Sequence, residues 1–195
     1  MKSRAGFSLI ELLCTLAVMV ILTVLVMGRG SPSAQKRARL ACKSNLEKIG
    51  LALSLYSSDN RGAYPSLDGA TTAESALSLL VPRCTALTEI FICPGSKDKE
   101  LPEGEPFGNG KISYAYYAGR TTNDDPGSVA VTDAQVNSSA KLTGQPLFSA
   151  SGHPPGNNHK NGGNLLQLNG AVNFSGVAAE RDLPVTGKVR LLNPK

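Results

Sequence analysis

The chain has 195 residues, 41% of them hydrophobic, and its 20 Lys and Arg against 15 Asp and Glu give a formal net charge of +5. At roughly 100–200 residues per domain this allows one modest domain with an appendage; the hydrophobic content excludes a disordered chain, and the single apolar stretch excludes a multi-span transporter. No nucleic-acid partner is expected, because the positive residues are dispersed and lack an aromatic platform.

The first predicted element is a long apolar segment near the N-terminus. The 21 residues from Phe7 to Met27 contain one charged residue, Glu11. A helix of that length covers roughly 31 Å, enough for a hydrocarbon core of about 30 Å, so we expect a transmembrane helix over residues 7–29. A secretory signal peptide is the alternative, but its apolar region is usually shorter and is followed by a cleavage site of small residues.

The residues around Glu11 resemble a known processing signal. Gly6-Phe7-Ser8-Leu9-Ile10-Glu11 follows a short basic leader and opens the apolar segment. This passage resembles the cleavage and methylation segment of type IV prepilins and type II secretion pseudopilins. The resemblance implies that a membrane aspartic prepilin peptidase removes the leader, residues 1–6, by cleavage after Gly6, and that the new terminus at Phe7 is N-methylated.

Electrostatics in lipid suggests a role for Glu11. An ionisable residue inside a membrane helix is costly and is by default a functional residue. Cleavage creates an ammonium group at Phe7, about one helical turn away. In a filament, Glu11 of one subunit can pair with the ammonium of a neighbour, which offsets the cost of both charges and fixes the axial register. A protonated carboxyl solvated at the membrane interface is the alternative.

The basic residues that flank the apolar segment predict an orientation in the membrane that conflicts with the one implied by the prepilin motif. Basic residues are more numerous after the segment than before it, which by the positive-inside rule places the C-terminal part in the cytoplasm. The prepilin motif is the more specific signal. It implies a single-pass protein of the bacterial inner membrane with its head domain in the periplasm or at the cell exterior.

A second helix is predicted from about Pro32 to Ser57, within an amphipathic half that covers residues 30–58. Its apolar residues recur at spacings of four and three along one face: Cys42, Leu46, Ile49, Leu53 and Tyr56. The passage from Ala41 to Pro65 is similar to a large bacterial group of pseudopilin-like proteins. Within it, Asp59-Asn60-Arg61-Gly62 is turn chemistry that ends the helix.

Residues 59–195 are predicted to form an α+β head. A short helix is expected from Thr72 to Leu80, and strands are expected at Leu87–Cys93, Ile112–Ala118, Val129–Thr132, Leu165–Leu168 and Ala171–Phe174. The last two flank Asn169-Gly170, a strong hairpin signal. The expected fold is therefore pilin-like: a long N-terminal helix packed on a small antiparallel sheet.

Four cysteines occur, and three of them are predicted to face an oxidising compartment, where disulfides persist. Cys14 is expected to pack as a small apolar residue in the membrane helix. Cys84–Cys93 closes a short loop and is the favoured pairing; Cys42–Cys93, which would join the helix to the head, is the alternative. Zinc is less favoured, because neither the Cys nor the His spacing forms an established ligand pair.

The histidines and several aspartates are further candidates. His153 and His159 are expected to be structural or surface residues, since no nucleophile motif surrounds the nearby serines. The spacing from His159 to Asn169-Gly170 resembles the closing motif of the same bacterial group, in which Asp stands in place of Asn169. Some major pseudopilins bind Ca²⁺ in a head loop, so the resemblance permits a weak calcium site among three aspartates: Asp124, Asp125 and Asp133.

These features predict a structural subunit without enzymatic activity or an obligatory cofactor. The expected assembly is a type IV pilus-like or type II secretion pseudopilus filament. Its expected partners are other pilin or pseudopilin subunits, the prepilin peptidase, an inner-membrane assembly platform and membrane lipid. The alternative is a prepilin-anchored surface or periplasmic binding module that does not polymerise.

Overall fold

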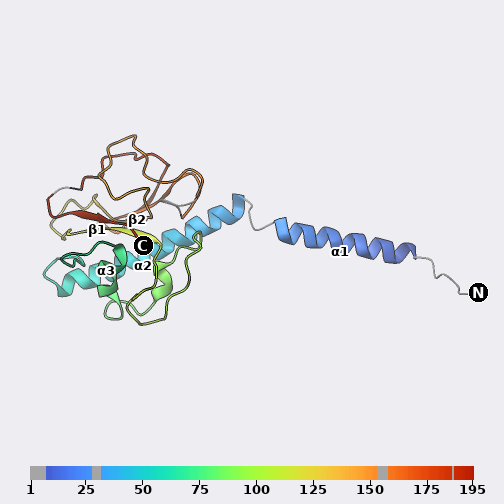
Figure 1. Cartoon of the computed structure of the whole chain (residues 1–195), viewed down its shortest axis with the longest axis horizontal. Coiled ribbons are helices and arrows are strands. Elements are labelled where there is room, and N and C mark those ends of the chain that lie inside the picture. The colour runs from blue at the N-terminus through green and yellow to red at the C-terminus, as the bar shows by residue number, and fades with distance from the viewer. Residues whose placement is uncertain (1–7, 28–31, 153–157, 186) are drawn as a thin grey trace, which may run out of the picture. The chain divides into compact units, whose positions relative to one another are not determined.

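The computed structural model describes residues 8–27, 32–152, 158–185 and 187–195. The chain divides into two compact units, Met1–Lys36 and Arg37–Lys195. The first unit contains helix α1 (Leu9–Met27) and the beginning of helix α2 (Pro32–Asp59). The second unit, called the head here, contains the rest of α2, a short helix and a five-stranded sheet (Figure 1).

Helix α1 forms within the apolar segment, where a helix is predicted. Its two threonines do not leave polar atoms unpaired, because the hydroxyl of Thr15 donates to the Leu12 carbonyl at 2.9 Å and that of Thr23 donates to the Val20 carbonyl at 2.8 Å. Such bonds to the preceding turn let hydroxyl side chains sit in a helix without water. Residues 28–31, where a break is predicted, lie outside the described part of the chain.

Helix α2 confirms the predicted amphipathic helix. Of its predicted apolar face, Cys42, Leu46, Ile49 and Leu53 are all buried, whereas Leu51, on the other face, is 68% exposed. The predicted turn ends the helix: Arg61 and Gly62 adopt positive φ angles, and the Gly62 amide donates to the Ser57 carbonyl at 2.8 Å. A left-handed residue that closes a helix in this way satisfies carbonyls of the last turn.

The segment after α2 differs in one element from the prediction. Helix α3 (Ala73–Leu77) and the 3₁₀ helix η2 (Ser78–Leu80) confirm the helix predicted from Thr72. The strand predicted at Leu87–Cys93 is wrong, because residues Thr88–Phe91 form a second 3₁₀ helix, η3. Ile90 and Phe91 are adjacent and both buried, while Leu87 is 43% exposed. Both side chains pack into the same core as α2 and α3, which the tight turn of η3 allows for adjacent residues.

The sheet is antiparallel throughout, with strand order β4-β3-β2-β1-β5. The segments predicted as the second to fifth strands are confirmed, and the last two are joined at Asn169-Gly170. One strand was not predicted: β5 pairs with β1 at the far edge, with Tyr117 opposite Leu191. The strands are β1 (Tyr114–Ala118), β2 (Val129–Asp133), β3 (Gly163–Gln167), β4 (Val172–Ser175) and β5 (Arg190–Leu192).

Both faces of this sheet are covered, so the head has more layers than the helix-on-sheet arrangement predicted. Tyr114 and Tyr116 of β1 point to the face on which α2 and α3 pack. Tyr117, on the opposite face of the same strand, joins Leu147, Phe148 and other residues of the C-terminal segments. Figure 1 shows α2 on one side of β1 and β2 and the orange loops on the other. The central strands are accordingly buried on both faces.

Candidate functional site

The carboxylate of Glu11 caps the N-terminus of α1. Its Oε2 atom accepts a hydrogen bond from the backbone amide of Ser8 at 3.0 Å. Ser8 directly precedes the helix and Glu11 is its third residue, the spacing of a capping box. The structure therefore gives Glu11 an intrachain partner that the sequence analysis did not consider. Gly6 and Phe7, the predicted cleavage and methylation residues, lie outside the described residues.

Helix α1 exposes apolar side chains around its circumference. Leu9 is 80% exposed and Glu11 is the only charged residue of the helix. A helix that is apolar on all sides requires an apolar surrounding, because one facing water buries a single stripe. Within residues 9–24, the part of α1 whose side chains the structure describes, eleven large apolar residues are exposed: Leu9, Ile10, Leu12, Leu13, Leu16, Val18, Met19, Val20, Ile21, Leu22 and Val24.

Of the helices that the structure describes, none combines the length and the apolar character needed to span a membrane.

All four cysteines are free thiols in the structure. Cys14 lies exposed on α1 and Cys84 is half-buried in the head. Cys42 and Cys93 are both buried and belong to one cluster of side chains, of which Cys84 is not a member. The disulfide pairings of Cys93 with Cys84 or Cys42 stay predictions.

The cluster consists of Cys42, Cys93, Asp133 and His159. One candidate ligand atom from each side chain lies within 4.8 Å of the other three, and all four residues are at most 3% exposed. The four come from different parts of the head. Cys42 lies on the packing face of α2, Cys93 follows η3, Asp133 ends β2, and His159 lies in the loop before β3.

Hydrogen bonds connect the members of the cluster. The Cys42 thiol donates to Asp133 Oδ1 at 3.1 Å, and Cys93 Sγ lies 3.3 Å from His159 Nε2. His159 Nε2 also lies 3.7 Å from Asp133 Oδ2. Within the part of the chain that the structure describes, Asp133 makes no ion pair with a lysine or arginine, and His159 Nδ1 has no hydrogen-bond partner.

A second set of polar groups holds the cluster in place. The side chain of Asn158 donates through Nδ2 to Asp133 Oδ1 at 2.7 Å. The backbone amide of Asn164 donates to Asp133 Oδ2 at 2.6 Å. The Gly95 amide donates to Cys93 Sγ at 3.3 Å, and the Tyr114 hydroxyl lies 3.1 Å from Cys42 Sγ. None of these four residues is among the site residues predicted from the sequence.

Close packing explains why Gly95, two positions after Cys93, is a glycine. A Cβ atom at Gly95 would lie 2.4 Å from the Asn158 carbonyl oxygen and 2.8 Å from two atoms of the His159 ring. Such distances are too short for any side chain. The Cys93-Pro94-Gly95 turn therefore brings the backbone against the imidazole, and Gly95 is the residue that permits the approach.

The environment raises the pKa values of Cys42 and His159 and lowers the pKa of Cys93. Burial raises the pKa of Cys42 well above its ordinary value, and the nearby Asp133 charge adds to this effect. Burial also disfavours the Cys93 thiolate, but hydrogen bonds with Cys42 and His159 outweigh it and lower the pKa of Cys93. Burial disfavours protonation of His159, yet Cys93 and Asp133 raise its pKa on balance. Relative to the two free side chains, these pKa shifts move the Cys93–His159 pair towards a thiolate beside an imidazolium.

The predicted calcium ligands are not brought together. Asp124 accepts a hydrogen bond from the Thr121 amide at 2.8 Å, and Asp125 accepts one from the Gly127 amide at 3.2 Å. Both are local turn interactions, whereas Asp133 lies in the buried cluster. His159 is a buried member of that cluster, and His153 lies outside the described residues.

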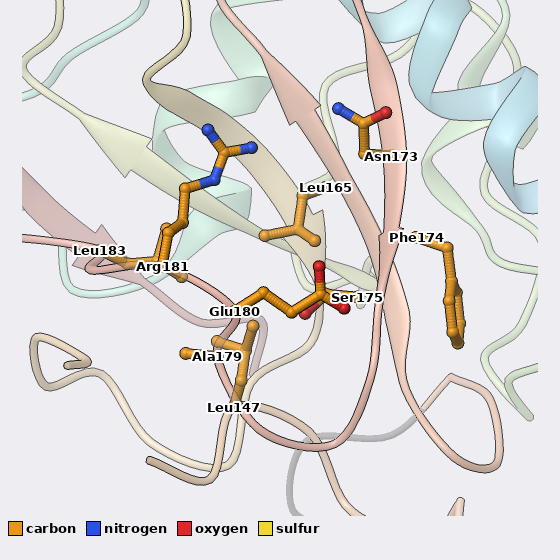
Figure 2. A pocket seen from close by; sticks show the side chains of 9 residues that line it. All are labelled: Leu147, Leu165, Asn173, Phe174, Ser175, Ala179, Glu180, Arg181 and Leu183. Carbon is orange, nitrogen blue, oxygen red and sulfur yellow. The ribbon is translucent and has the colours of Figure 1, made fainter. Parts of the chain in front are cut away.

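A small hollow lies on the face of the sheet opposite to α2 (Figure 2). Its volume is about 30 Å³, far below the roughly 300–1,000 Å³ of ordinary ligand pockets. Arg181 at its rim donates to the Gly127 carbonyl at 3.1 Å, so this guanidinium serves to hold a loop. The hollow is lined by Leu147, Leu165, Asn173, Phe174, Ser175, Ala179, Glu180, Arg181 and Leu183.

An N-terminal helix followed by a second helix and an antiparallel sheet defines an α+β, pilin-like fold. Residues 1–27 match the family model of the prokaryotic N-terminal methylation motif, which is the signature of type IV pilins and pseudopilins. This motif fits a pilin-like or pseudopilin subunit and indicates a structural protein that associates with other pilin subunits and with prepilin peptidase. No curated protein and no solved structure matches the chain.

Proposed function

We propose that the chain is a subunit of a type IV pilus-like or type II secretion pseudopilus filament. Before assembly it is anchored in the bacterial inner membrane by α1, with the head in the periplasm or at the cell exterior. Prepilin peptidase cleaves after Gly6, the amine of Phe7 is methylated, and an inner-membrane platform adds the processed subunit to the filament.

The observation that carries this proposal is the exposed apolar surface of α1, which lies within the segment that matches the methylation motif. Patches of this kind on soluble proteins mark contacts with proteins or membranes. Burying one large aliphatic side chain contributes about 1.5–3 kcal/mol. Eleven such side chains therefore supply a large driving force for association with lipid first and with neighbouring α1 helices later.

In this proposal, pairing by Glu11 fixes the axial register between neighbouring α1 helices. Glu11 follows Phe7 by four residues in the sequence, so the amine that cleavage creates would lie about one helical turn from the carboxylate. Within a subunit the carboxylate caps the Ser8 amide. In the filament the same carboxylate pairs with the amine of a neighbouring subunit, so that neither charge stays unpaired among apolar side chains.

Replacing Glu11 tests the pairing. Glu11→Gln keeps an acceptor for the Ser8 amide but removes the charge, whereas Glu11→Leu removes both. Because breaking a buried ion pair costs about 3–5 kcal/mol, we expect each variant to lower the filament yield more than ~100-fold while membrane content is retained. Filaments are measured in the sheared fraction of cells that contain the prepilin peptidase, and the terminus is determined by mass spectrometry.

Glu47→Gln is the matched control, since Glu47 is an exposed glutamate on α2 whose nearest ion-pair partner is Lys43 at 3.9 Å. It should leave filament yield unchanged. Normal assembly by Glu11→Gln would reduce the role of Glu11 to helix capping. An intact Met1 terminus in the wild-type protein would contradict processing, and a wild type that never polymerises would favour a membrane-anchored binding module.

A further inference from the structure

We propose that Cys42, Cys93, Asp133 and His159 form a binding site for a divalent metal ion of the zinc class. The ion would join α2 to the sheet and to the loops on either side of it. The site is structural, because four protein ligands leave no coordination position for a substrate. It is independent of the proposed filament function, since every ligand lies within the head.

The spacing of the donor atoms fits tetrahedral coordination. Zinc bonds of about 2.0–2.3 Å place neighbouring ligand atoms roughly 3.3–3.8 Å apart. Three of the distances in the cluster are 3.1 Å from Cys42 Sγ to Asp133 Oδ1, 3.3 Å from Cys93 Sγ to His159 Nε2 and 3.7 Å from His159 Nε2 to Asp133 Oδ2. All four donor atoms fall within 4.8 Å of one another. The longest of these separations must close by up to about 1 Å for all four atoms to take tetrahedral positions around one ion.

The surrounding hydrogen bonds are those that orient metal ligands. Carboxylate ligands are usually themselves hydrogen-bonded, and such partners affect affinity about 10- to 100-fold. Asn158 and Asn164 donate to the two oxygens of Asp133, and the Gly95 amide donates to the sulfur of Cys93. These donors fix the direction of the lone pairs before any ion binds.

The charge of the cluster also calls for a cation. The carboxylate of Asp133 is fully buried, and among the described residues its only ion-pair partner is His159. Burying a charge is expensive unless it is paired or bound to a metal, and the imidazole, 3.7 Å away, pairs with this carboxylate only when it is protonated. A divalent ion offsets two of the three negative charges that Asp133 and the two thiolates carry when they bind it. Its binding releases two protons, one from the Cys42 thiol and one shared between Cys93 and His159.

A Cys42–Cys93 disulfide is the competing outcome, and it explains less of the site. It would use two of the four side chains and leave the carboxylate and imidazole without a function. Two sulfurs, one imidazole nitrogen and one carboxylate oxygen are a donor set suited to Zn²⁺, whereas Ca²⁺ and Mg²⁺ prefer oxygen ligands. The donor set therefore selects the zinc class.

The test is metal binding by the full chain, purified in detergent, reduced and freed of metal. Titration with Zn²⁺ should give one ion per chain and raise the unfolding temperature. Co²⁺ as a probe should give the absorption of tetrahedral thiolate coordination. We expect Cys93→Ser and His159→Gln to lose the cobalt spectrum and weaken Zn²⁺ binding at least ~100-fold, and Asn158→Ala to weaken it about 10- to 100-fold.

Cys84→Ser is the matched control, because it removes a head cysteine outside the cluster. It should bind as the wild type does. The proposal is overturned if the reduced wild type binds neither ion, if Cys84→Ser weakens binding as much as Cys93→Ser, or if the protein isolated without reductant contains a Cys42–Cys93 disulfide and no metal. Should the ligand variants fail to fold, the wild-type stoichiometry and cobalt spectrum decide.

Discussion

Replacing Gly119 with alanine is expected to lower the free energy of unfolding of the head by about 4 kcal/mol or more, at the upper end for single substitutions. Gly119 follows β1 with φ of +87°, and an added Cβ would lie 2.1 Å from the Lys188 carbonyl oxygen. Lys188 leads into β5, so the methyl group would push that strand off the edge of β1. Hydrogen exchange of β1 and β5 amides in the full chain measures the loss.

Gly144→Ala is the matched control for this prediction. Gly144 has the same φ of +87°, but nothing lies within 4 Å of the position of its Cβ. Its substitution should cost only the backbone strain of about 1–2 kcal/mol. The difference between the two variants is therefore the effect of the close approach to Lys188. Equal losses would mean that the backbone before β5 moves aside freely.

Replacing Leu46 with alanine is expected to cost about 2–5 kcal/mol, the range for deleting a buried leucine side chain. Leu46 is fully buried on the face of α2 that packs on the sheet. The substitution removes apolar contacts and leaves a cavity that the rigid sheet fills only in part. Urea unfolding of the full chain, compared through protection of the β1 to β3 amides, measures the effect.

Leu51→Ala supplies the comparison on the same helix. Leu51 is 68% exposed, and leucine and alanine have similar helix propensities, so this change should stay within about 0.5 kcal/mol. A loss at Leu51 as large as that at Leu46 would show that the outer face of α2 is covered in the intact chain. Filament neighbours would be the first candidates for such a cover, so the measurement belongs on unassembled protein.

The local elements of the fold could be predicted from the sequence. The regular spacing of apolar residues from Cys42 to Leu53 predicts the buried face of α2, and Asn169-Gly170 predicts the hairpin between β3 and β4. Strand β5 could not be predicted in this way. It has three residues, and its partner β1 lies more than 70 positions earlier in the chain. A pairing of this length depends on tertiary structure rather than on a local pattern.

The same distinction applies to the candidate sites. The methylation motif is contiguous, and Glu11 was identified from six neighbouring residues. The buried cluster is assembled from residues 42, 93, 133 and 159, which no spacing rule for ligands relates. The four members carry three unrelated sequence signals: Cys42 and Cys93 are disulfide candidates, Asp133 is a candidate calcium ligand, and His159 is part of a closing motif. Only the fold places them together.

The tyrosines of β1 allow unfolding of the head to be followed by intrinsic fluorescence. The chain has five tyrosines and no tryptophan. All five lie after residue 55, and Tyr114, Tyr116 and Tyr117 are at most 1% exposed. Intrinsic fluorescence of the intact protein therefore arises mainly from tyrosine in the head, with no indole emission to mask it. Loss of the sheet can be followed by this signal in detergent, in vesicles or in assembled fibres, without an added dye.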